Sequence, residues 1–158
     1  MFSIIIPTFN NLDYLKLCIY SIKKNSIYDH EIIVHVNEGI DGTLDYLDKT
    51  GIKYTYSKKN DGVCIAFNKA SDLATREYLV LGHDDMYFCP NWDLEFKKEL
   101  DKIDHKNFFL SGTMVQYFNG LIELDCGSNP QNFNENKILK SYQILNLRIF
   151  KGHIGNLH

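Results

Sequence analysis

The segment FSIIIPTFNNLDYLKLCIYSI, residues 2–22, joins an apolar, β-branched run to a short polar stretch and then to a second apolar pattern. Residues 2–8 have the length and composition of a strand. Apolar side chains then recur at the spacing of one helical face, at Leu12, Leu15, Ile19 and Ile22. The segment therefore predicts a strand, a loop and an amphipathic helix.

The alternation of strand and helix continues along the chain. Further strands are predicted at residues 31–36, 52–57, 78–81 and 108–117, and helices at residues 43–49, 63–75 and 94–103. Residues 78–81, YLVL, have the composition of a buried strand. Because parallel strands need crossover connections, this order predicts an α/β fold with an open, mostly parallel sheet and helices on both faces.

Polar clusters follow three of the predicted strands, at residues 7–11, 37–43 and 83–85. Ligands of open α/β sheets bind at the carboxyl ends of the strands, so we expect these clusters to converge on one crevice. The last cluster contains two adjacent carboxylates, Asp84 and Asp85. Such a pair must be solvated, paired with cations or bound to a metal, and these residues alone leave the three alternatives open.

The composition is that of a single folded domain without the charge signature of a nucleic-acid-binding protein. The chain has 158 residues, 44% of them apolar, which fits one domain with a packed core. The formal net charge of -3 gives no electrostatic footprint for nucleic acid. The N-terminal apolar run is interrupted by Pro7 and is too short for a transmembrane segment, and the four cysteines form no CxxC pair. We expect a cytoplasmic protein with reduced thiols, whose oligomeric state the sequence does not indicate.

Four segments, in this order, resemble the family 2 glycosyltransferases with the GT-A fold. Residues 2–22 resemble the opening strand, the P-T or P-x-Y/F-N loop and the first helix. EIIVHVNEGIDGT is similar to the second strand and its acidic loop, with Asn37 and Glu38 at the two leading acids. KKNDGVCIAFNKA resembles the N-x-G-x-x-x-A-x-N segment, and EYLVLGHDDMYFCPNW resembles the strand and D-x-D metal motif.

Two departures from the family pattern concern the site. When Pro90 is set at its usual distance, Asp85 aligns with the second acid of D-x-D and His83 with the first. Phe67 stands where many members have an arginine. Independently of the resemblance, Asp41 lies in D-G-T before an apolar run, so it is predicted to cap the following helix rather than to touch a ligand.

The resemblance implies an inverting, metal-dependent enzyme that moves a sugar from a nucleotide-diphosphate donor, a UDP-sugar, to a glycan, lipid or protein acceptor. It implies that Mn²⁺ or Mg²⁺ is held by Asp85 and by His83, although His83 could instead cap the turn. It also implies recognition of the base by Glu38, which could otherwise be a solvated loop acid. The implied nucleotide- and donor-binding residues are Pro7, Thr8, Asn10, Glu38, Asn60, Gly62, Asn68 and Asp84.

The resemblance also implies a catalytic acid residue downstream of D-x-D, and this segment is not found. Glu123 and Asp125 are the nearest acids, but they follow the preceding strand too closely to match it, so the catalytic base is unassigned. We expect one GT-A-type domain over residues 1–158, incomplete at its C-terminus. Residues 1–95 would form its nucleotide-binding half and residues 96–158 the start of its acceptor half. The alternative is a nucleotide-sugar binding module without turnover.

Overall fold

The computed structural model describes residues 1–112, 115–116 and 122–144. The chain divides into two compact units. Residues 1–24 and 28–88 form the first unit, and residues 25–27 and 89–158 belong to the second. The sequence-predicted site residues up to Asp85 all lie in the first unit, so that unit is described first.

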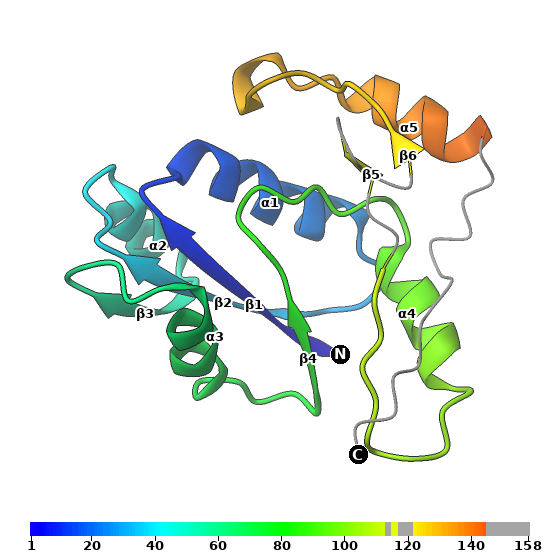
Figure 1. Cartoon of the computed structure of the whole chain (residues 1–158), viewed down its shortest axis with the longest axis horizontal. Coiled ribbons are helices and arrows are strands. Elements are labelled where there is room, and N and C mark those ends of the chain that lie inside the picture. The colour runs from blue at the N-terminus through cyan, green and yellow to red at the C-terminus, as the bar shows by residue number, and fades with distance from the viewer. Residues whose placement is uncertain (113–114, 117–121, 145–158) are drawn as a thin grey trace. The chain divides into compact units, whose positions relative to one another are not determined.

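The first unit is built on a four-stranded parallel sheet (Figure 1). Its strands are β1 (Phe2–Phe9), β2 (Glu31–Asn37), β3 (Lys53–Ser57) and β4 (Tyr78–Leu81), in the order β3-β2-β1-β4. The predicted open parallel α/β sheet is therefore confirmed. Because all strands run the same way, their carboxyl ends meet at one edge, where the polar clusters were expected.

Three helices connect these strands, α1 (Leu12–Asn25), α2 (Thr43–Thr50) and α3 (Val63–Ser71). Figure 1 shows α3 on one face of the sheet and α1 and α2 on the other, as predicted. Ile5 and Ile33 form a buried cluster with Ala70 of α3. The apolar residues of α1 that predicted its buried face are indeed buried or partly buried, and Leu15, Ile19 and Ile22 are at most 2% exposed.

The strand at residues 78–81 was predicted correctly, but its burial was not. Leu79 and Leu81 are 48% and 50% exposed. The reason is the position of β4 at the edge of the four-stranded sheet, where a strand has a neighbour on one side only. Leu81 is paired with Ile5 and so lies on the face that α3 covers, but α3 contacts β1, β2 and β3.

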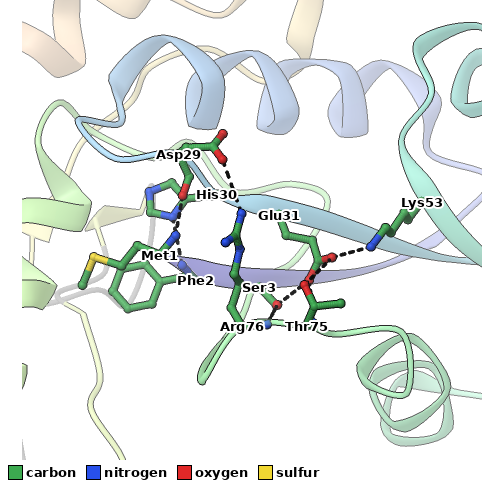
Figure 2. A network of polar contacts seen from close by, with 9 residues as sticks. All are labelled: Met1, Phe2, Ser3, Asp29, His30, Glu31, Lys53, Thr75 and Arg76. Carbon is green, nitrogen blue, oxygen red and sulfur yellow. Dashed lines mark hydrogen bonds and ion pairs between the residues drawn. The ribbon is translucent and has the colours of Figure 1, made fainter.

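The predicted helix at residues 63–75 ends earlier, at Ser71. Its expected last turn is replaced by contacts at the amino edge of the sheet, where the carboxylate of Glu31 accepts hydrogen bonds from Ser3, Lys53 and Thr75 (Figure 2). The backbone N–H of Arg76 donates to the Ser3 hydroxyl. Burial alone would raise the pKa of Glu31, but these hydrogen bonds lower it to about 2. The network ties the segment that precedes β4 to the other three strands.

The second unit contains α4 (Trp92–Leu100), the short parallel pair β5 (Val115–Gln116) and β6 (Ile122–Glu123), a 3-10 turn (Pro130–Asn132) and α5 (Glu135–Ile144). Trp92 is buried, its ring packs edge-on against Phe96, and its Nε1 donates to Ser26. Among the described residues, every helix falls short of the length and apolar content that crossing a bilayer requires.

The predicted strand at residues 108–117 is wrong over most of its described length. Residues 108–112 have no regular structure, and only β5 is a strand. Phe109 is 60% exposed, and Ser111 and Gly112 offer little side chain to pack on a sheet. Residues 113, 114 and 117 lie outside the described residues.

Candidate functional site

Side-chain hydrogen bonds connect the loops that follow β1, β2 and β4 at the carboxyl edge of the sheet. The Thr8 hydroxyl donates to Asp84 Oδ2 at 2.6 Å, across 76 residues of sequence. Asn10 Nδ2 donates to Glu38 Oε2 at 3.0 Å. The loop after β1 is therefore bonded to both of its neighbours, so the three predicted clusters lie together as the sheet topology led us to expect.

Pro7 lies inside β1, which continues to Phe9, so it does not end the strand. The Ile5 carbonyl points toward β4, where it accepts the N–H of Gly82. Backbone groups two residues apart in a strand point to the same side, so the backbone nitrogen of Pro7, like the carbonyl of Ile5, points to the side of β4. At the level of Pro7 there is no β4 residue to pair with, because β4 ends at Leu81. The missing N–H of Pro7 therefore costs no sheet hydrogen bond.

Asp84 is partly buried. Burial raises the pKa of Asp84, and the charge of Asp85 adds to this effect, whereas hydrogen bonds from Thr8 and Asn11 oppose it. The contribution of Asn11 was missed from the sequence, although a second amide in FNN was its signal. Two carboxylates side by side, one of them partly desolvated, form a place where a cation is favoured.

Asn10 and Glu38 share an uncommon backbone conformation. Their φ angles are 48° and 62°, in the left-handed region that few non-glycine residues occupy. The Asn10 side chain donates to Glu38 Oε2 and accepts the N–H of Ile40 at 3.0 Å, so it holds the loop after β2 at two points. Strained residues of this kind cluster at ligand sites. Here they orient the Glu38 carboxylate.

Asp41 acts at the N-terminal ends of two helices. Its Oδ1 accepts from the backbone N–H and hydroxyl of Thr43, at the start of α2, and its Oδ2 accepts the N–H of Leu12, at the start of α1. The residue at the N-cap position of α2 is Gly42. Asp41 therefore satisfies helix-terminal N–H groups, as predicted, but from one residue earlier and for α1 as well.

Asn60 and Gly62 form the turn that leads into α3. Asn60 Oδ1 accepts the N–H of Gly62 at 2.9 Å, and Gly62 has a φ of 86° that favours glycine. Asp61 accepts hydrogen bonds from Ser57 and Lys69, and its N–H donates to Asn37 Oδ1. Asn37, aligned with an acid of the family, thus anchors this turn to β2. Asn68 is exposed on α3.

The predicted metal ligands, Asp85 and His83, are both exposed. The His83 ring packs edge-on against Phe67 with the ring centroids 5.7 Å apart, so the two departures from the family pattern contact each other. Within the described ranges, no group of three or more His, Cys, Asp or Glu side chains could hold a metal ion. One or two protein ligands suit a divalent cation whose other positions are filled by phosphate oxygens and water.

Glu123 and Asp125 belong to the second unit. Glu123 ends β6 and is exposed. Asp125 Oδ1 accepts the N–H of Gly127 at 3.0 Å, and its Oδ2 lies 3.9 Å from Lys137 Nζ, which are contacts of a turn. Their candidacy as catalytic base rests on the sequence alone. The predicted start of the acceptor half includes residues 145–158, which lie outside the described residues.

A parallel sheet of this order, with acids after β2 and β4, defines a GT-A-type α/β fold. The model of the family described as Glycosyl transferase family 2 matches residues 3–153, and the chain belongs to this family.

Curated relatives carry the same class of name. The chain is 36% identical over 94 residues to a PGL/p-HBAD biosynthesis glycosyltransferase of Mycobacterium bovis, a match that covers 56% of this chain and 37% of that protein. It is 37% identical over 119 residues to an uncharacterized glycosyltransferase of Rickettsia conorii, covering 70% of this chain and 19% of that protein. The chain thus spans well under half the length of these relatives.

Solved structures share the fold. TarS of S. aureus (residues 1-349, in complex with UDP) matches with a TM-score of 0.65 and 21% identity, over 80% of this chain and 39% of that one. The mannosyltransferase PcManGT of Pyrobaculum calidifontis, in complex with GDP-Man and Mn²⁺, matches with a TM-score of 0.61 and 17% identity, over 75% and 36% of the two chains. At these identities the likeness concerns the fold.

Proposed function

We propose that this protein transfers a sugar from a UDP-sugar to a glycan, lipid or protein acceptor with inversion, and that the donor binds at the carboxyl edge of the sheet. The observation that carries the proposal is the joining of three loops there, through the Thr8–Asp84 and Asn10–Glu38 hydrogen bonds. Family membership and the UDP in the TarS structure support it.

A divalent cation, Mn²⁺ or Mg²⁺, fits the exposed acid turn. When bound, it would neutralise the negative charge that grows on the departing diphosphate. Asp85 and His83 would hold it, and Asp84, fixed by Thr8, would accept hydrogen bonds from hydroxyls of the donor ribose or sugar. The Mn²⁺ in the PcManGT structure supports the use of a divalent cation.

Glu38 would recognise the base. A carboxylate accepts a hydrogen bond from the imide N–H of uracil, and Asn10 holds Glu38 Oε2 so that the carboxylate has a fixed orientation. The remaining donor contacts would come from backbone and side-chain groups of Pro7, Thr8, Asn60, Gly62 and Asn68.

Residues 1–95 would thus form the nucleotide-binding half of a cytoplasmic enzyme, and residues 96–158 would begin the acceptor half. Inversion requires a general base that removes the proton of the acceptor hydroxyl. Glu123 and Asp125 are the first residues to test for that role.

A nucleotide screen tests the proposal. UDP, GDP, dTDP and CMP are each titrated into the chain by calorimetry, with and without Mn²⁺. We expect UDP with Mn²⁺ to bind most tightly. Tightest binding by GDP would contradict the assignment of the donor. Incubation with radiolabelled UDP-sugars and a mixed acceptor extract then measures transfer, and donor binding without transfer would identify a nucleotide-sugar binding module instead.

A further inference from the structure

Helix α1 buries the side chains of Cys18 and Ser21, which are both 0% exposed. Residues three positions apart lie on the same face of a helix. Both side chains contact the backbone of the segment that carries the acids.

The contacts are at the two ends of that segment. The Cys18 thiol donates to the carbonyl oxygen of His83, with a distance of 3.4 Å between sulfur and oxygen. The N–H of Phe88 donates to Ser21 Oγ at 2.9 Å. The Ser21 hydroxyl donates in turn to the carbonyl oxygen of Cys18 at 2.7 Å, which leaves a lone pair aimed at Phe88.

Between the two contacts lie residues 83–88, HDDMYF. Within this turn the N–H of Met86 donates to the His83 carbonyl at 3.3 Å, and just before it the N–H of Gly82 extends the pairing of β4 with β1. The turn therefore leaves the sheet at a defined point, and one face of α1 holds its first and last residues. Asp85 is exposed between them.

We infer that Cys18 and Ser21 are positioning residues, which hold both ends of the 83–88 turn and thereby fix the carboxylate of Asp85 for the metal–diphosphate complex. This inference rests on the proposed function, because it concerns the same site. Neither side chain would touch the ligand. Each would act through the backbone of the turn.

The chemistry of Cys18 suits this role. The thiol is fully buried and lies within hydrogen-bond distance of the His83 carbonyl oxygen, which can only accept, so the thiol is the donor. A serine at this position keeps an O–H donor in nearly the same place, whereas an alanine has none. Comparing Cys18→Ser with Cys18→Ala therefore distinguishes the effect of losing the hydrogen bond from the effect of losing side-chain volume.

The test compares UDP binding with Mn²⁺ and with a chelator, measured by calorimetry. Loss of a group that orients a metal ligand typically costs about 10- to 100-fold in affinity. We expect Ser21→Ala and Cys18→Ala to weaken binding with Mn²⁺ by about tenfold and binding with chelator by less than about twofold. Cys18→Ser is expected to restore most of the metal-dependent binding. If Cys18→Ser bound UDP with Mn²⁺ as weakly as Cys18→Ala does, the hydrogen bond of Cys18 would have no positioning role.

Ser3→Ala is the matched control. Ser3 is also buried, and its hydroxyl also accepts a backbone N–H, that of Arg76, while it donates to Glu31, but it lies at the amino edge of the sheet (Figure 2). We expect Ser3→Ala to lower the thermal midpoint as Ser21→Ala does, while the ratio of the two UDP affinities stays at its wild-type value. If the ratio changed equally in Ser3→Ala and Ser21→Ala, the inference would be overturned. The weaker binding would then follow from the loss of stability that the two variants share.

Amide hydrogen exchange without ligand separates this inference from the proposed function. Ser21→Ala should speed exchange across residues 83–88, and Ser3→Ala should not. If wild-type protein bound no UDP but this exchange pattern held, the proposed function would fail and the holding of the turn would stand. Unchanged exchange across residues 83–88 in Ser21→Ala would overturn the inference whatever the protein binds.

Discussion

The hydroxyl of Thr8 donates a 2.6 Å hydrogen bond to Asp84, a carboxylate that is 76 residues away in the sequence. Thr8 is buried near the end of β1, and Asp84 lies in the turn after β4. The bond compensates for part of the burial of Asp84. It also brings the acid turn against the loop that is proposed to bind the nucleotide.

Replacing Thr8 by valine removes this donor at nearly constant volume. A partly buried carboxylate then loses a hydrogen bond, so we expect the free energy of unfolding to fall by about 1–2 kcal/mol in urea denaturation. Thr50→Val is the control, because the Thr50 hydroxyl bonds to helix carbonyls at an exposed position and its loss should cost about 0.5 kcal/mol or less. Equal losses in the two variants would show that the Thr8–Asp84 bond adds no stability.

Glu31 predicts a pH dependence of stability. Its folded-state pKa is lowered from an ordinary value of 4.5 to about 2, against the effect of burial, by hydrogen bonds from Lys53, Ser3 and Thr75. A lowered carboxyl pKa contributes stability above the unfolded-state pKa and loses it as pH falls through the folded-state pKa. Thermal midpoints of Glu31→Gln and wild type should therefore differ most at pH 6 to 7 and converge progressively as the pH falls from about 5 to about 2. A constant difference over this range would contradict the assignment.

The proposed contact of Glu38 with the base predicts which nucleotides bind most tightly. A carboxylate accepts from the protonated N3 of uracil but meets a lone pair on cytosine, so UDP and dTDP should bind more tightly than CDP. In Glu38→Gln the amide can donate to cytosine, so the ratio of UDP to CDP affinity should fall by about tenfold, which calorimetry can measure. If CDP bound wild type as tightly as UDP, Glu38 would lose this role.

His83 predicts the choice of metal. Imidazole suits Mn²⁺ better than the harder Mg²⁺, which favours oxygen ligands. We expect UDP binding to reach half-saturation at a lower concentration of Mn²⁺ than of Mg²⁺, and His83→Asp to reduce that difference. If His83→Asp kept the same preference for Mn²⁺ over Mg²⁺, the His83 ring would not be a metal ligand, and its role would be the packing contact with Phe67.

The order of strands and helices in the first unit was predictable because each element has its own hydrophobic period, which neighbours in the sequence determine. The clustering of Thr8, Glu38 and Asp84 followed from one rule, that parallel strands end at the same edge. What periodicity does not encode is the order of strands within the sheet. The exposure of Leu79 and Leu81 on β4 was missed for that reason.

Side-chain contacts within the site could not be predicted from the sequence for a different reason. Asn10 and Glu38 adopt left-handed conformations and are joined by a side-chain hydrogen bond, and neither is glycine, the usual signal for such a backbone. The contact between Phe67 and His83 depends on how α3 packs on the sheet. Both departures from the family pattern were visible in the sequence, but their proximity was not.

The acid turn after β4 is proposed to bind a nucleotide through a divalent cation. The most direct measurement is the thermal midpoint with UDP, taken with Mn²⁺ and with a chelator, in wild type, Asp85→Asn and Glu77→Gln. Glu77 is the matched control, because it is an exposed acid just before the opposite end of β4. Ligand at about a hundred times its dissociation constant should add roughly 2.7 kcal/mol to the stability of a protein that binds it only when folded.

We predict that UDP stabilises wild type and Glu77→Gln much more with Mn²⁺ than with chelator, and that Asp85→Asn abolishes this difference. Equal stabilisation of wild type by UDP with Mn²⁺ and with chelator would contradict the claim, as would an undiminished gain in Asp85→Asn.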